Sequence, residues 1–392
     1  MTFVLSADNV FNYLQEHDLC TREEAENSHI EVKYAKNYNL LIGLPGDRKL
    51  LVKQERYNSE GKTAGEFLTE WRTRELLQTI PELNMLCPLL PEILHFGEAE
   101  SILVFNYLTD CRDLSGFYGL KNGFPPAIAT VIGSALGQIH RSTFKGEQYQ
   151  EFISKHNQSV PKENFAKFSR SMSRITPEVF GRVPADAIKF FTLYQRYDSL
   201  ARAISELDNA FQPSCLTHND LKLNNILLHD RWETYVASAA TASKSIRIID
   251  WERCGWGDPA FDLGLTISSY MQIWLGNLVV NNSMDIQESL RIAMIPLESI
   301  QPSIAALMRA YLSVFPEIIE YRPDFLVKVV QFTGFSFIQQ IQAMIQYQKY
   351  FGNTSICLLQ VAKSLLCRPQ ESITTVFGTV PEQLMPLIPL AA

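Results

Sequence analysis

Apolar and polar positions in the first third of the chain mostly follow the two-residue period of strands. Helical spacing occurs at residues 6–19, with Ser6 as the expected cap, and again at 63–80. The strand-like segments are 29–34, 39–44, 50–53, 91–96 and 101–108, and the second helical segment lies between the third and the fourth of them. This order predicts a small antiparallel sheet of five strands with one helix between them.

After residue 108 the apolar positions recur mainly at helical spacing. Pro125 or Pro126 can open a helix that runs to residue 140. Residues 185–211 and 263–366 are also rich in helical pattern. The rest of the chain is therefore expected to form a larger, mainly helical lobe.

Two short apolar segments inside the helical part, 226–228 and 245–250, predict strands. Between them, residues 231–244 are rich in Ala, Ser and Thr, which predicts an extended and mobile hairpin loop. The whole pattern indicates an α+β protein with a sheet lobe over residues 1–108 and a larger helical lobe over 109–392.

Composition and charge exclude several classes of protein. Of the 392 residues, 46% are hydrophobic and 20% are charged, which is ordinary for a folded globular protein and unlike a disordered one. The net charge is −7 and Lys and Arg form no cluster, so we expect no binding to nucleic acid. The apolar runs are shorter than the roughly 20 residues that span a bilayer, and residues 1–9 lack the pattern of a signal peptide. We therefore expect a cytoplasmic protein that does not enter the membrane.

The seven cysteines are scattered, and no two of them form a Cys-x-x-Cys pair. This spacing predicts reduced thiols and gives no indication of disulfides or of a structural zinc site.

One short segment carries the residue types that phosphoryl transfer needs. Residues 218–225 have the sequence His-Asn-Asp-Leu-Lys-Leu-Asn-Asn, and an apolar strand follows them. Transfer to a hydroxyl needs a carboxylate that takes the acceptor's proton, oxygen ligands for magnesium, and positive charge near the transferring group. Asp220 and Asn225 lie five residues apart, so one can face the acceptor and the other the metal. Asp250, at the end of the next predicted strand, can complete the set of metal ligands.

This segment resembles the catalytic loop of protein kinases, His-Arg-Asp-Leu-Lys-x-x-Asn, with Asn219 in place of the Arg. The sequences Ile-Ile-Asp-Trp-Glu at 248–252 and Gly-Asp-Pro-Ala-Phe-Asp-Leu at 257–263 are similar to motifs of the aminoglycoside phosphotransferase and choline kinase family. Ala-Leu-Gly-Gln-Ile-His at 135–140 resembles the same family. The resemblance implies a protein-kinase-like two-lobed fold that binds ATP and Mg²⁺ between its lobes.

The resemblance also implies roles for the matching residues of the helical lobe. Asp220 corresponds to the catalytic base, and Asn225 and Asp250 correspond to the two magnesium ligands. Lys222 matches the lysine with which protein kinases neutralise the transferring phosphoryl group. His218 matches the residue that braces the catalytic loop from below.

In the sheet lobe, Lys53 corresponds to the lysine that binds the α- and β-phosphates. Glu70 on the following helix is the carboxylate expected to anchor this lysine, and Glu66, one turn earlier, is the alternative. Asn106 and Tyr107 lie in the segment that corresponds to the hinge, whose backbone binds the adenine edge.

Four further residues extend the expected site. Asp262 corresponds to a buried carboxylate that holds backbone amides of the catalytic loop, and Glu252 corresponds to a residue near the metal. Protein kinases cover the phosphates with a glycine-rich loop, whereas the equivalent residues 34–39 contain no glycine. Asn37 and Asn39 are candidates for nucleotide contacts there, because their amides can assist the backbone.

The sequence leaves the acceptor and the oligomeric state open. A small molecule such as an amino sugar, sugar or amino alcohol is the first candidate. The alternative is a Ser or Thr of a ribosomally made peptide, since phosphotransferases that resemble this family occur in pathways that phosphorylate and then dehydrate such peptides. Glu252 and Asp258 could line an acidic pocket for a cation, with Trp251, Trp256 and Trp274 adding cation–π contacts, or the tryptophans could belong to the core. A pseudokinase is a third alternative, although the sequence retains each expected site residue.

Overall fold

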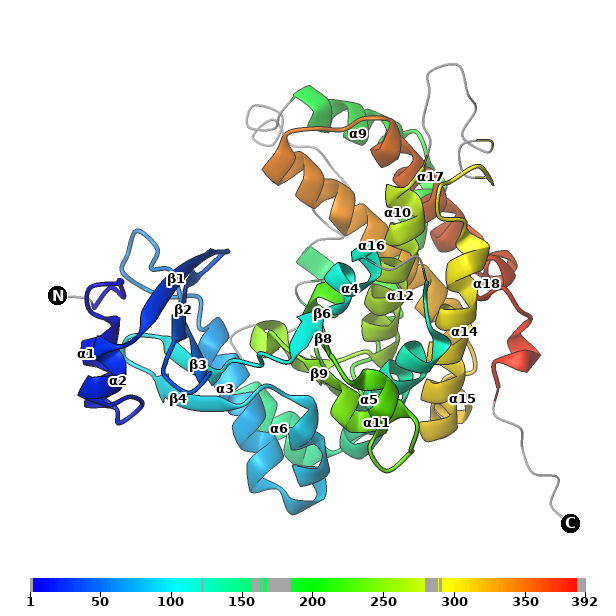
Figure 1. Cartoon of the computed structure of the whole chain (residues 1–392). Helices are drawn as coiled ribbons and strands as arrows, with labels where there is room; N and C mark the ends of the chain where they lie inside the picture. The colour runs from blue at the N-terminus through cyan, green and yellow to red at the C-terminus, as the bar shows by residue number, and fades with distance from the viewer. Residues whose placement is uncertain are drawn as a thin grey trace, which may run out of the picture.

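The computed structural model describes residues 3–120, 123–156, 163, 165–167, 185–278, 288 and 291–385. A small sheet forms one side of the molecule and a larger set of helices forms the other (Figure 1). The fold is α+β and protein-kinase-like, as the sequence predicted.

The sheet contains the five predicted strands, and each neighbouring pair is antiparallel. The spatial order is β1-β2-β3-β5-β4. The strands are β1 (His29–Tyr34), β2 (Tyr38–Gly43), β3 (Lys49–Gln54), β4 (Ile93–Gly97) and β5 (Ile102–Asn106).

The alternation of side chains along β3 decides which groups reach the site. Leu50 and Val52 join the apolar core on the face covered by helix α1 (Val10–Glu16), whereas Leu51 packs with Phe67 of helix α3 (Glu66–Thr79) on the other face. Because side chains two residues apart point the same way, Lys53 shares the face of Leu51. The strand therefore directs this lysine toward α3 and the helical lobe.

The first helix is shorter than the predicted 6–19 and is not capped by Ser6. Its N-cap is Asn9, and the Asn9 Oδ1 atom accepts a hydrogen bond from the Ser6 backbone N–H at 2.8 Å. The asparagine side chain thus closes a turn ahead of the helix, so regular helix begins only at Val10. A second short helix, α2 (Arg22–Glu26), precedes the sheet.

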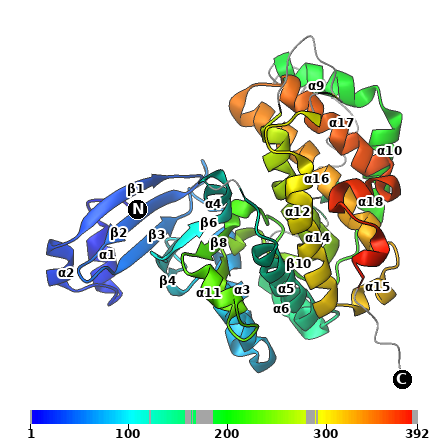
Figure 2. The same ribbon diagram turned by 45° about the vertical axis from the view of Figure 1, so that its right-hand side comes forward.

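The long helices of the larger lobe lie side by side. Figures 1 and 2 both show α12 (Pro259–Gly276) between α14 (Leu297–Val314) and α16 (Phe325–Gln348), and α5 (Pro126–Thr143) packs against α14. A Cβ atom at Gly133 would lie 2.0 Å from the Leu307 carbonyl oxygen, so glycine lets α5 approach α14 closely. The remaining helices here are α4 (Leu114–Leu120), α6 (Glu147–His156), α9 (Ala185–Gln195), α10 (Asp198–Asn209), α15 (Glu317–Tyr321), α17 (Asn353–Cys367) and α18 (Pro369–Phe377).

Short strands in the helical lobe flank the catalytic segment. A three-stranded sheet has the order β6-β8-β9, and β7 pairs with β10. The predicted strands at 226–228 and 245–250 are confirmed, although the second ends at Ile248. The five strands are β6 (Cys111–Asp113), β7 (Cys215–Thr217), β8 (Ile226–His229), β9 (Ile246–Ile248) and β10 (Gly255–Gly257).

The prediction of an extended hairpin loop at 231–244 is wrong. The segment forms a short helix, α11 (Trp232–Val236), and a 3-10 turn, η3 (Ala242–Ser245). Trp232 is buried against Phe117, with ring centroids 6.2 Å apart. This aromatic contact fixes the segment to α4, which the local composition does not reveal.

We propose that the lobes divide at residue 108, although apolar packing crosses that point. Leu76 and Leu77 of α3, and Leu83 in the turn η1 (Pro81–Leu89), belong to the same apolar core as the large helices. All seven cysteines lie in the described residues and none of them forms a disulfide, which agrees with the prediction of reduced thiols. Among the helices of the described residues, none is both long enough and apolar enough to span a bilayer.

A buried ion pair anchors the start of α12. Arg322 Nη1 lies 2.6 Å from Asp258 Oδ2, and the exposed fractions of these side chains are 4% and 0%. The same carboxylate accepts hydrogen bonds from the Gln212 and Ala260 backbone N–H groups, and the second of these caps the helix. Loss of the arginine would leave a buried carboxylate without its counter-charge.

We therefore expect Arg322→Met to lower the free energy of unfolding by about 3–5 kcal/mol, measured by chemical denaturation. Arg141→Met is the matched control, because Arg141 and its partner Glu317 are both about half exposed, and removal of an exposed pair costs at most about 1 kcal/mol. Equal stability of the two variants would refute the anchoring role of Arg322.

Candidate active site

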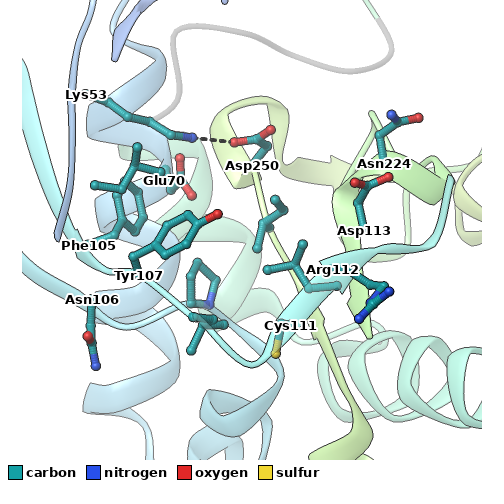
Figure 3. Close-up of a pocket in the computed structure, with 15 residues that line it drawn as sticks. Lys53, Glu70, Phe105, Asn106, Tyr107, Cys111, Arg112, Asp113, Asn224 and Asp250 are labelled. Carbon is teal, nitrogen blue, oxygen red and sulfur yellow. Dashed lines mark hydrogen bonds and ion pairs between the residues drawn. The ribbon is translucent and has the colours of Figure 1, made fainter. Parts of the chain in front are cut away.

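A cavity of about 480 Å³ lies between the sheet and the helical lobe (Figure 3). Leu51, Lys53 and Phe105 line it from the sheet, and Asp250 reaches it from the segment that follows β9. The other lining residues are Glu70, Pro91, Asn106, Tyr107, Leu108, Cys111, Arg112, Asp113, Asn224, Leu227 and Ile249. The cavity therefore joins the predicted hinge, the phosphate-binding lysine and one predicted metal ligand in one space.

Lys53 and Asp250 meet across the two lobes. The Lys53 Nζ atom lies 2.6 Å from Asp250 Oδ1, as the dashed line in Figure 3 shows. Burial alone would lower the pKa of the Lys53 ammonium, but Asp250 and then Glu70 outweigh it and raise that pKa. Burial alone would likewise raise the pKa of Asp250, but the Lys53 ammonium lowers it. Each charge thus keeps the other ionised inside the cavity.

The predicted ion pair between Lys53 and Glu70 is absent from the described residues, because Lys53 pairs with Asp250. Glu70 is only 2% exposed, and neither of its carboxylate oxygens has a hydrogen bond of ordinary geometry. Burial raises the pKa of Glu70 to about 8, so the group is mainly neutral at pH 7. Glu70 still lines the cavity beside Lys53, whereas the alternative, Glu66, forms an ion pair with Lys36.

Asp262 holds the catalytic segment through hydrogen bonds to its backbone, as the sequence predicted. Asp262 Oδ2 accepts a hydrogen bond from the His218 backbone N–H at 2.7 Å, and Oδ1 accepts one from the Asn219 N–H at 2.8 Å. His218 Nε2 lies 2.9 Å from the Ile249 carbonyl oxygen, and its ring packs against Trp251 at 4.8 Å. His218 thus links the loop to the strand that carries Asp250.

Two residues of the site adopt the left-handed backbone conformation. Asn219 and Asp250 both have φ of +62°. Asn and Asp tolerate this conformation better than other residues with a side chain, because their short polar groups bond locally. The asparagine that replaces the kinase arginine therefore suits the backbone at its position.

The Asp220 carboxylate lies beside two cations. Lys222 Nζ is 3.0 Å from Asp220 Oδ2, and Arg253 Nη1 is 4.0 Å from Oδ1. All three side chains are partly exposed, so an acceptor or a phosphoryl group can approach them. The contact with Lys222 agrees with the kinase pattern, whereas sequence reasoning missed Arg253, which no motif singles out.

Asn225 and Asp250 fit a magnesium ion by the chemistry of their oxygen atoms. The Asn225 side-chain N–H₂ donates to the Asp220 carbonyl oxygen at 2.9 Å, which leaves its amide oxygen as an acceptor. The Ile249 N–H donates to the Asn225 carbonyl oxygen at 2.9 Å, so the segments that carry the two residues are adjacent. In the part of the chain that is described, no three His, Cys, Asp or Glu side chains form a metal cluster. Two protein ligands suit Mg²⁺, which commonly completes its coordination with phosphate and water.

Besides Lys53 and Glu70, the sequence predicts four residues that contact the nucleotide, and two of these four line the cavity. Asn106 and Tyr107 do so, but the Asn106 side chain donates to Glu92 Oε2 at 2.9 Å. Figure 3 shows that this side chain points away from the other lining groups, so Asn106 offers the cavity mainly its backbone. Asn37 and Asn39 are not among the lining residues, and their nucleotide contacts stay predictions.

Lys36 forms ion pairs that connect the turn between β1 and β2 to both lobes. It stands at the turn between β1 and β2, where protein kinases have their glycine-rich loop. Its ammonium forms ion pairs with Glu66 of α3 and, at 3.4 Å, with Glu252. Sequence reasoning missed this residue, although a lysine in a loop without glycine is a signal that could have drawn attention to it.

The acidic pocket suggested for a cationic acceptor is not formed by the expected residues. Asp258 is fully buried and paired with Arg322. Trp251, Trp256 and Trp274 are exposed by 1%, 8% and 6% and belong to the core cluster. These residues therefore stabilise the helical lobe and present no aromatic surface to a ligand. Sequence reasoning also missed Asp113 and Asn224, which line the cavity without belonging to a motif position.

Comparison with known proteins agrees with this geometry. A solved structure of an ADP-bound aminoglycoside phosphotransferase is 13% identical, with a TM-score of 0.51 over 92% of this chain and 99% of that one. A glucosamine kinase is 13% identical, with a TM-score of 0.50 over 93% and 85%. A choline/ethanolamine kinase family protein from Mesorhizobium loti is 17% identical, with a TM-score of 0.44 over 90% and 93%.

The aminoglycoside phosphotransferase and the glucosamine kinase support a shared fold, while the family model establishes the family. No curated protein matches the sequence. The model of the phosphotransferase enzyme family, APH, matches residues 36–285, which is well over half of the chain and includes Lys53, Asp220 and Asp250. This chain belongs to the phosphotransferase enzyme family.

Proposed function

We propose that this protein transfers the γ-phosphoryl group of ATP to a hydroxyl of an acceptor molecule. The observation that carries the proposal is the meeting of Lys53 and Asp250 inside a cavity bordered by the hinge. A lysine for the nucleotide phosphates and a carboxylate for the metal must converge there for phosphoryl transfer. A pseudokinase would be expected to lack one of these parts, and none of them is missing.

In the proposed reaction, Asp220 takes the proton of the acceptor hydroxyl. The acceptor oxygen bonds to the γ-phosphorus as the bond from that phosphorus to the β–γ bridging oxygen breaks, and ADP leaves with the electron pair. Lys222 and Arg253, on either side of Asp220, supply positive charge where the transferring group is expected. Mg²⁺ held by Asn225 and Asp250 would neutralise negative charge on the phosphates.

A small-molecule acceptor is preferred over a peptide. Relatives in the comparison include an aminoglycoside phosphotransferase and a glucosamine kinase, and these names refer to small molecules. The contact between Lys222 and Asp220 matches protein kinases and keeps a peptide Ser or Thr as the alternative.

We expect Asp220→Asn to lower phosphate transfer by about 10²–10⁴-fold, the usual contribution of a general base. The KM for ATP should change little, because Asp220 is not among the residues that line the nucleotide cavity. ADP release is measured with a panel of sugars, amino sugars, amino alcohols and Ser/Thr peptides. A variant that turns over at the wild-type rate would remove Asp220 from the mechanism.

Asp250→Asn should lower transfer by at least about 10²–10³-fold even at saturating Mg²⁺, because the amide lacks the charge that holds the metal. Asparagine tolerates the left-handed backbone at this position, so the fold should persist. Asp230→Asn is the control, since Asp230 is about half exposed and pairs with Arg112. Normal turnover of Asp250→Asn would contradict the metal assignment.

Lys53→Ala should raise the KM for ATP and lower kcat while the melting temperature stays close to that of the wild type. Glu70→Gln should lower kcat/KM for ATP by less than about 10-fold, because Lys53 pairs with Asp250 and Glu70 is mainly neutral at pH 7, so the amide changes little charge beside the lysine. Glu66→Gln is the matched comparison, since Glu66 contacts Lys36 and not Lys53. If Glu70→Gln impairs ATP use as strongly as Lys53→Ala, the Glu70 carboxylate is charged and holds Lys53 in the ATP-bound protein, which would contradict its neutral state.

A further inference from the structure

A second cavity of about 840 Å³ borders the catalytic segment on the side of the helical lobe. It lies between α4, which contributes Ser115 and Tyr118, and α12, which contributes Gln272 and Ile273. Asn224 of the catalytic segment lines both this cavity and the nucleotide cavity. A molecule bound here and a nucleotide in the first cavity could therefore both contact Asn224.

The catalytic segment and the cavity wall are also joined by a hydrogen bond. The Leu223 backbone N–H donates to Ser269 Oγ of α12 at 3.0 Å, and both residues line the second cavity. A serine hydroxyl that accepts this bond can still donate one to a ligand. Contacts made in the cavity are thereby linked to the position of the segment that carries Asp220.

The described lining of this cavity contains no Asp, Glu, Lys, Arg or His. Its polar groups are hydroxyls and amides, such as those of Ser115, Asn224 and Gln272, and its apolar groups include Phe124 and Met294. The phenol of Tyr118 also remains neutral, because burial raises its pKa to about 12.

A cavity lined by uncharged side chains is expected to bind a neutral ligand more strongly than a charged one. A cation that enters it loses hydration and meets no carboxylate among the described lining residues, which is costly. Amides and hydroxyls each donate and accept hydrogen bonds, so they match the hydroxyls of a neutral sugar or polyol. The apolar side chains can pack against the carbon-bound faces of such a molecule.

We propose that this second cavity binds the acceptor, and that the acceptor is an uncharged, polyhydroxylated small molecule such as a neutral sugar or glycoside. The inference rests on the proposed function, because it assigns the cavity to the acceptor of that reaction. It separates this chain from relatives whose names refer to amino sugars or amino alcohols. Gln272 is then a residue that determines specificity.

The test uses acceptor pairs that differ mainly in one charge: glucose with glucosamine, and glycerol with 3-amino-1,2-propanediol. Transfer from ATP is measured by the amount of ADP released and by the mass of the phosphorylated product. The baseline is the ADP released when no acceptor is added. The neutral member of at least one pair should have a kcat/KM at least about 10-fold above its partner, since each tenfold preference corresponds to about 1.4 kcal/mol.

Gln272→Glu places a carboxylate in the cavity wall and should shift this preference toward the cationic member by about 10-fold, with the KM for ATP unchanged. Gln360→Glu is the matched control, because Gln360 is exposed on α17 and does not line the cavity. It should keep the preference of the wild type. A fold defect in Gln272→Glu would lower kcat for both members of a pair by the same factor and leave their ratio unchanged, so a changed ratio separates specificity from misfolding.

Three outcomes would overturn the inference while leaving the proposed function intact. These are equal or better use of the cationic members by the wild type, phosphate on peptide Ser or Thr alone, and ADP release that no neutral acceptor raises above the baseline. Failure of the wild type to bind ATP, or ADP release that persists in Lys53→Ala, would overturn the proposed function itself.

Discussion

The geometry of the site depends on the buried carboxylate of Asp262. Both of its oxygens accept backbone N–H groups of the catalytic segment, and His140 Nε2 lies 3.3 Å from Oδ2. The Asp262 side chain is only 1% exposed. A buried carboxylate is costly unless it is fully bonded, so this group stabilises one arrangement of the loop and disfavours others. The position of Asp220 thus follows from the position of α12.

The start of α12 is in turn fixed by a second buried acid, Asp258. Its bonds to Arg322 and to the Gln212 and Ala260 N–H groups join three separate parts of the helical lobe. The acidic residues of the Gly-Asp-Pro-Ala-Phe-Asp motif are therefore both buried in this chain and bonded to groups of the helical lobe. This explains why the motif can be highly specific for the fold and still say nothing of the acceptor.

The sequence predicted the elements whose pattern is local. The five strands, α3, α5 and the role of Asp262 as loop anchor follow from periodicity or from motif positions, and the structure confirms them. The helix and turn at 231–244 depend on the burial of Trp232 against Phe117, a contact across 115 residues of chain that composition cannot show. The pairing of Lys53 with Asp250 was missed for a similar reason, because the two residues lie 197 positions apart and only the fold brings their charges together.

The lining of the proposed acceptor site also could not be predicted from the sequence. A count of nearby acidic and aromatic residues suggested a pocket for a cation, since Glu252, Asp258 and three tryptophans lie close together in the sequence. In the fold, the tryptophans belong to the hydrophobic core, Asp258 forms an ion pair with Arg322, and Glu252 forms one with Lys36. The polar side chains in the described lining of the second cavity are hydroxyls and amides, most of them from α4, α12 and the catalytic segment. Such residues are common everywhere in a sequence, so only their convergence in space distinguishes them. Charge near a motif therefore indicates how this protein holds its catalytic loop, whereas the uncharged side chains of the described lining beside that loop are the basis of the proposed preference for a neutral acceptor.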